Sequence, residues 1–136
     1  MALHKEFIKL SSEYWDRSRA LDGVGGDEEF LSEMAGIFSA ACPTLLRNLE
    51  ESTASRDLLS AADTARLLGR AARNLAATQV TEAALVVETM ARGNEFNAIE
   101  SAYLTLQQEA GRLLDALANF RNGRSGLSGR PGPRTP

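Results

Sequence analysis

Residues 96–120 read FNAIESAYLTLQQEAGRLLDALANF, and their apolar side chains recur at intervals of three or four positions. This spacing places those side chains on one face of an α-helix, because an α-helix completes a turn every 3.6 residues. The stretch therefore predicts a helix from about Phe96 to Phe120. Its expected inward face consists of Ile99, Ala102, Leu106, Ala110, Leu113, Leu117 and Phe120.

Upstream, the segment from Glu28 to about Glu51 has the same helical spacing over a long stretch. Asp27 follows two glycines and is a natural N-cap, since its carboxylate can accept a hydrogen bond from a free backbone amide of the first turn. Pro43 lies inside the stretch and predicts a kink, because proline lacks the amide hydrogen of the helical ladder. The predicted inward face is Phe30, Met34, Ile37, Phe38, Ala41, Leu45 and Leu49.

Two further helices are predicted between these two. The first runs from about Asp57 to Ala76. The second runs from about Gln79 to Ala91, with Thr78 as its cap and Gly93-Asn94 as its end. The inward residues are predicted to be Leu58, Ala61, Ala65, Leu68, Ala72 and Leu75 in the first helix, and Val80, Ala83, Ala84, Val87 and Met90 in the second.

A short N-terminal helix is indicated by EYWDRSRAL at residues 13–21, and its apolar pattern extends back through Phe7 and Leu10. No stretch alternates like a β-strand. The expected fold is all-α, an antiparallel up-down four-helix bundle with an additional N-terminal helix, since amphipathic helices joined by short loops bury their faces most simply in this way. The bundle is expected over residues 1–121. Residues 122–136 are rich in Gly, Pro and Arg and predict a disordered tail.

The composition is that of a soluble globular protein, with 43% apolar and 24% charged residues in a chain of 136. Four of the 15 cationic residues and none of the 18 acidic residues follow position 120, so residues 1–120 have a net charge of −7. Such an acidic body lacks the basic footprint of a nucleic-acid-binding protein. The longest apolar run, residues 83–87, is too short to span a membrane. Cys42 is the only cysteine, so no disulfide can form within the chain, and a cytoplasmic protein is expected.

Two segments resemble the histidine phosphotransfer (HPt) domain family. DRSRALDGVGGDEEFLSEMAGIFSAACPTLLRNL (residues 16–49) is similar to the start of such a domain, which has a leucine-bearing short helix, Gly-Gly-Asp-Glu-Glu, and a long helix with Phe and then Pro-x-Leu-Leu. NLAATQVTEAALVVETMARGNEF (residues 74–96) is similar to the family's Asn-aromatic/aliphatic-Gly-Ala turn, its Ala-rich helix and its Gly-Asp-like turn. The order and spacing agree without gaps over about residues 16–120. The resemblance implies a module of two-component signal transduction, acting in a phosphorelay.

The chemistry of that family lies on its second long helix, in a His-x-Leu-Lys-Gly motif whose exposed imidazole accepts a phosphoryl group from a receiver domain. Here Leu68, Asn74, Leu75 and Ala77 fall on family positions, and Arg66 stands where the histidine would be. Arginine cannot replace histidine, because a guanidinium group stays protonated and offers no lone pair. A register shifted by one residue supplies no histidine either. The resemblance therefore implies a pseudo-phosphotransfer protein, a degenerate family member that does not accept phosphate itself.

No other residue replaces the missing histidine. His4, the only histidine, precedes the resembling region by about a dozen residues and is interpreted as a solvated side chain. Cys42 has apolar neighbours on a predicted helix and is interpreted as a core residue. No cluster of histidine, cysteine and acidic residues has the spacing of a metal site. We therefore expect no enzymatic activity, no cofactor and no metal.

Three arginines recur at one-turn intervals on the solvent side of the helix predicted at residues 57–76, within about 60° of one another on a helical wheel. Gly69 lies among them and costs about 1 kcal/mol of helix propensity relative to alanine, but it removes a side chain where a partner would approach. Two leucines project to the same side. The predicted partner-binding set is Arg66, Gly69, Arg70 and Arg73 with Leu59 and Leu67.

By the resemblance, the partner of this set is a response-regulator receiver domain or a histidine kinase. Arginines can pair with the carboxylates that form a receiver's active site. An ordinary solvated polar face with two exposed leucines is the alternative interpretation of the same residues. Two other functions are considered for the whole chain: a structural or self-associating helical bundle without receiver binding, and a working phosphotransfer protein with an unrecognised acceptor. The sequence is compatible with a free protein and with a piece of a hybrid kinase.

Overall fold

A computed structural model describes residues 14–129 of the chain and the side chains of residues 14–123. Within residues 14–129 the structure has helices and no strand, which confirms the predicted all-α class. The helices are α2 (Arg17–Gly23), α3 (Glu28–Ala54), α4 (Leu58–Asn74), α5 (Thr78–Arg92) and α6 (Phe96–Gly129).

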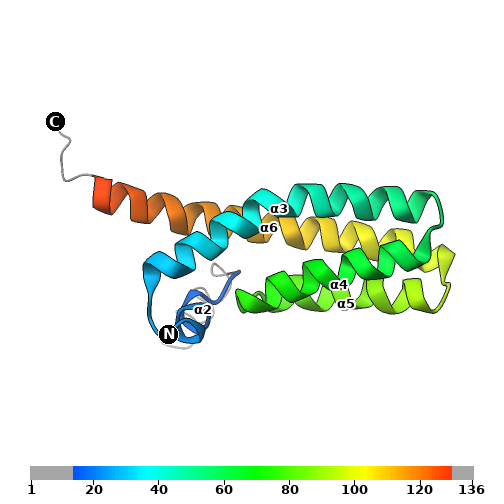
Figure 1. The fold of residues 1–136 in the computed structure, drawn as a ribbon, viewed down its shortest axis with the longest axis horizontal. Helices are drawn as coiled ribbons and strands as arrows, with labels where there is room; N and C mark the ends of the chain where they lie inside the picture. Colours follow the sequence, from blue (N-terminus) through cyan, green and yellow to red (C-terminus); the bar gives the residue numbers. More distant parts are fainter. Residues whose placement is uncertain (1–13, 130–136) are drawn as a thin grey trace, which may run out of the picture.

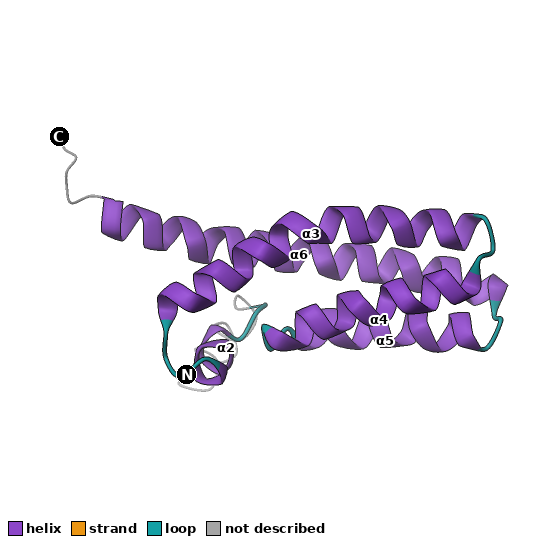
Figure 2. Cartoon of the chain, viewed as in Figure 1, coloured by secondary structure: helices purple, strands orange, loops and turns teal. Residues whose placement is uncertain are grey.

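Helices α3, α4, α5 and α6 lie side by side, and α2 lies near the end where α3 begins (Figure 1). Both α3 and α5 contact α4 and α6, so each of these four helices has two neighbours around a common core. Consecutive helices run in opposite directions, and the connecting loops at 55–57, 75–77 and 93–95 are short (Figure 2). The first turns of α3 and the last turns of α6 extend beyond α4 and α5.

The three loops between α3 and α6 share one backbone geometry. The middle residue of each loop is left-handed, with φ of 62° at Arg56, 55° at Ala76 and 58° at Asn94. The amide of the third loop residue donates to the carbonyl five residues earlier, at 2.9–3.0 Å. This is the Schellman arrangement, which satisfies carbonyl groups left free at the end of a helix. The predicted stop of α5 at Gly93-Asn94 is confirmed.

Aspartate side chains begin two of the four long helices. The Phe30 amide donates to Asp27 Oδ1 at 3.0 Å, which confirms the predicted N-cap of α3, and the Ser60 amide donates to Asp57 Oδ1 at 3.2 Å at the start of α4. The predicted cap at Thr78 is wrong. Because the preceding loop has three residues, the N-cap position of α5 falls on Ala77, which has no side chain able to accept a hydrogen bond.

The predicted inward faces of α4 and α6 are fully confirmed, since every residue named for them is buried. In α5, Met90 is partly buried and the other predicted residues are buried. In α3 the prediction is partly wrong, because Ile37 is 70% exposed, Phe30 is 49% exposed and Ala41 is also exposed. Helix α3 carries two apolar rows with helical spacing. The row that contains Ile37 faces outward, and the second row faces the core. That inner row is Leu31, Ala35, Phe38, Cys42 and Leu49.

The helix ends differ from the predicted ones at α6. This helix continues to Gly129, whereas the sequence predicted its end near Phe120 and an irregular tail from residue 122. No proline lies between residues 121 and 129, so the backbone can keep donating helical hydrogen bonds up to Gly129. Pro43 lies inside α3 without ending that helix. The rest of the predicted tail, at 130–136, lies outside the described residues, as do Phe7 and Leu10.

The segment leading into α2 is attached to the ends of two longer helices. The indole Nε1 of Trp15 donates to the carbonyl of Leu75 at 2.7 Å, just after the end of α4. The Trp15 ring meets Phe120 of α6 edge to face, with centroids 5.6 Å apart. These buried contacts close the core at the end of the helices where α4 stops.

Candidate docking surface on α4 and α5

The three arginines of the predicted partner-binding set lie on the surface of α4. Arg66, Arg70 and Arg73 are all exposed, and together with Gly69 they line one side of a hollow of ≈250 Å³. The other side comes from α5, which contributes Thr81, Leu85 and Glu88. We call this the arginine hollow. Three of its residues are cations at one-turn spacing, so they project in the same direction along the groove between the two helices.

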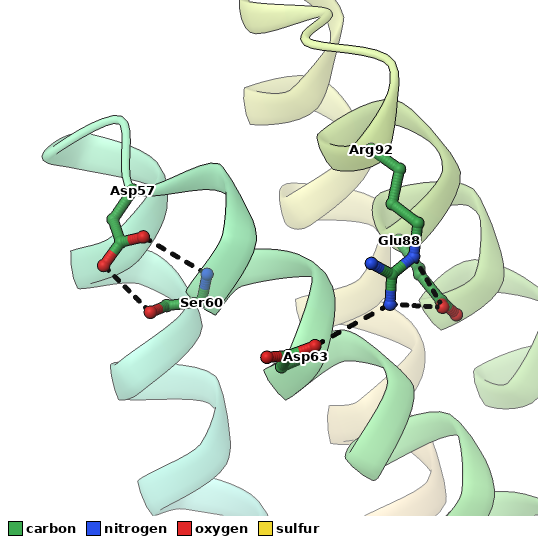
Figure 3. A network of polar contacts seen from close by, with 5 residues as sticks. All are labelled: Asp57, Ser60, Asp63, Glu88 and Arg92. Carbon is green, nitrogen blue, oxygen red and sulfur yellow. Dashed lines mark hydrogen bonds and ion pairs between the residues drawn. The ribbon is translucent and has the colours of Figure 1, made fainter.

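The arginine hollow has an excess of positive charge. Its one carboxylate, Glu88, accepts hydrogen bonds from Nε and one terminal nitrogen of Arg92, each at 3.1 Å. The same Arg92 nitrogen lies 3.7 Å from Asp63 of α4, so Arg92 joins the two helices (Figure 3). Arg66, Arg70 and Arg73 have no hydrogen-bond or ion-pair partner among residues 14–123. Their guanidinium groups are therefore available to a carboxylate or phosphoryl group.

Gly69 has a structural reason within the bundle itself. A methyl group added there would lie 3.2 Å from Cβ of Ala84 on α5, closer than most side-chain contacts. Glycine at 69 and alanine at 84 therefore let α4 and α5 approach each other closely. The sequence predicts that this glycine eases the approach of a partner, whereas in the structure it is explained by the close packing of α4 against α5.

The two predicted leucines do not lie in the arginine hollow. Leu59 is 71% exposed and lines a separate, more apolar hollow of ≈290 Å³ with Leu58, Ala62 and Ala91. Leu67 is 56% exposed and lines neither hollow. Sequence reasoning missed Leu85, which is 59% exposed within the arginine hollow. The sequence does carry a signal for this residue. Leu85 lies outside the predicted inward face of α5, so its side chain is expected to be exposed.

Residues 14–129, which the structure describes, contain no histidine. Cys42 is completely buried, as predicted, and burial raises the pKa of its thiol to about 11, so the reactive thiolate is disfavoured. Between residues 14 and 123, no group of three His, Cys, Asp or Glu side chains could hold a metal ion. His4 lies outside the described residues.

None of the described helices is both long and apolar enough to cross a membrane. Comparison with known proteins finds no matching family model, curated protein or solved structure. The resemblance to HPt domains therefore rests on the residues of this chain alone.

Proposed function

We propose that this protein is an HPt-like signalling module, an antiparallel four-helix bundle that docks a receiver domain or a histidine kinase and does not accept a phosphoryl group. The observation that carries the proposal is the arginine hollow, in which exposed Arg66 occupies the histidine position of the resemblance. Receiver active sites are built from carboxylates, so their charge is complementary to three unpaired guanidinium groups.

The turn after α4 is compatible with the HPt alignment. The family pattern has a glycine in the turn where this chain has Ala76, and Ala76 is left-handed, with φ of 55°. A left-handed residue is the reason a pattern would demand glycine. In the alignment, the glycine of the family therefore corresponds to Ala76, whose backbone conformation favours glycine although the residue is alanine.

Docking without phosphoryl transfer follows from the chemistry of arginine. A guanidinium group can donate two parallel hydrogen bonds to a carboxylate or a phosphoryl group, but it has no lone pair with which to attack phosphorus. A receiver held on the arginine hollow would therefore keep its phosphoryl group. The protein would act by occupying a receiver surface that a competent phosphotransfer partner also needs.

The docking proposal is tested by calorimetric titration of a panel of receiver domains with the full chain. We expect binding by at least one receiver and a loss of about tenfold or more in affinity for Arg70→Glu, because one favourable ion pair becomes a repulsive contact. Arg19→Glu is the matched control, since it makes the same charge change at an exposed position of α2. Equal affinities for the two variants, or no binding by any receiver, would contradict the proposal.

The absence of phosphoryl acceptance is tested separately with a phosphorylated receiver carrying a radioactive label. No label is expected to transfer to the chain, whether or not His4 is replaced by alanine. Stable transfer to the His4→Ala variant would show that another residue is an acceptor. The non-acceptor assignment would then be wrong.

A further inference from the structure

An apolar row on the outer side of α3 is left uncovered in the structure. It consists of Phe30, Met34, Ile37 and Ala41 and is distinct from the inner row that faces the core. Ile37 is 70% exposed and Phe30 is 49% exposed, Ala41 is exposed, and Met34 is partly buried. Single exposed apolar side chains are common on protein surfaces, but a row of them along one helix marks an interaction surface.

The outer row has the spacing of a coiled-coil seam. Its members follow one another by four, three and four positions, and the same alternation continues to Thr44 and Asn48. A 3-4 alternation keeps side chains at the contact line between two helices over several turns. From Phe30 to Asn48 the seam is about 27 Å long, at a rise of about 1.5 Å per residue. This length suits the packing of one further helix against α3.

We propose that the outer row is the interface of a homodimer, in which two copies of α3 pack antiparallel about a two-fold axis. The seam uses two positions of each heptad, the first (Met34, Ala41) and the fourth (Ile37, Thr44). In an antiparallel pair, a residue at the first position of one helix faces a residue at the fourth position of the other. The register that centres the seam places Ile37 opposite Ala41 of the second copy, Met34 opposite Thr44, and Phe30 opposite Asn48. The most apolar layers then lie nearest the axis.

The charges that flank the seam favour this arrangement. Glu33 and Arg47 lie on the same flank, are both exposed, and have no ion-pair partner among residues 14–123. In the antiparallel register Glu33 faces Arg47 of the second copy, and the two-fold axis repeats the pair at the other end. Ala40 lies between them and meets its own symmetry mate, where a small side chain permits close approach.

A parallel pair lacks this complementarity. There, Glu33 would face the position of Phe38 in the second copy and Arg47 would face the position of Ser52, so neither charge would meet an opposite one. The charged flank is therefore complementary to itself only when the two helices run in opposite directions. This self-complementarity favours a second copy of the chain over an unrelated helix, and the interface is separate from the arginine hollow on α4 and α5.

Sedimentation equilibrium of the full chain over a range of concentrations tests the dimer. The average mass is expected to rise toward twice the 14.7 kDa of one chain. Ile37→Glu is expected to weaken the dimer by at least about a hundredfold, because each dimer loses two buried isoleucine side chains. Leu59→Glu is the matched control, since Leu59 is 71% exposed on α4, lies outside the outer row and lines a hollow with Ala91 and Arg92 of α5, and it is expected to leave the dimer unchanged.

A charge exchange tests the antiparallel register. Glu33→Arg and Arg47→Glu are each expected to weaken the dimer by about tenfold, and the double variant is expected to restore it, because its ion pairs are reversed rather than lost. Circular dichroism checks that every variant is folded. The proposal is overturned by a wild-type chain that stays monomeric at all concentrations, by a dimer indifferent to Ile37→Glu, or by a double variant as weak as the single ones. Because receiver titration probes α4, failure of the dimer leaves the docking proposal standing, and the reverse also holds.

Discussion

Ala76 offers a direct test of the turn between α4 and α5, because its φ of 55° lies where a side chain is crowded. A residue with a Cβ atom is less stable there than glycine by about 1–2 kcal/mol. Replacing Ala76 by glycine removes that strain. It also gives the unfolded chain more freedom, which lowers stability by about 0.4–1 kcal/mol. It further removes a partly buried methyl group, worth about 0.3 kcal/mol at partial burial.

The sum of these effects is a net gain of about 0.5 kcal/mol for Ala76→Gly. In a domain of this size that corresponds to a rise in Tm of about 2 °C. Ala71 is the matched control, since it is also a partly buried alanine that packs against the core but lies inside α4 with ordinary helical geometry. Ala71→Gly is expected to lower stability by about 1 kcal/mol. Thermal and urea unfolding followed by far-UV circular dichroism measure both variants. If Ala76→Gly lowers stability as much as Ala71→Gly does, Ala76 is not strained in this turn.

Two further predictions concern Cys42 and Asp57. Burial raises the pKa of the Cys42 thiol from 9.0 to about 11, so the folded state binds this proton more tightly than the unfolded state. The contribution of Cys42 to the free energy of unfolding is therefore complete below pH 9 and is lost as the pH rises through 11. In a Cys42→Ala chain, the free energy of unfolding is expected to fall less over this pH range than in the wild type. Urea unfolding at a series of pH values measures the difference. Asp57→Ala is expected to lower the free energy of unfolding by about 1 kcal/mol, because the cap to the Ser60 amide and the bond from the Ser60 hydroxyl at 2.8 Å are both lost (Figure 3). An Asp57→Ser variant keeps a capping oxygen, and if it were no more stable than Asp57→Ala in the same assay, the capping explanation would fail.

The sequence predicts most of the helical architecture because each helix carries its own signals. The 3/4 spacing of α6 and the aspartate cap of α3 act within a few residues, so they can be recognised without knowing what packs on them. The face of α3 could not be predicted in this way, because the rows containing Ile37 and Leu31 have equivalent spacing. Only contacts with the other helices decide which row is buried.

In the candidate site, too, some features are determined by a single helix and others by the contact between two helices. The exposure of Arg66, Arg70 and Arg73 follows from the periodicity of one helix, and it was predicted correctly. The contribution of Leu85 and the packing of Gly69 against Ala84 depend on how α4 and α5 face each other. Such relations between two helices are absent from the spacing within either one.

The three-residue turns have a consequence for how the chain folds. Because each reversal of direction is made by residues next to the helices it joins, α3 meets α4, α4 meets α5, and α5 meets α6 across short stretches of sequence. Little chain entropy is lost in closing such loops. The pairing of α3 with α6 spans the greatest sequence distance, and it can form after the local hairpins have brought those helices together. A chain of such low contact order is expected to fold within milliseconds.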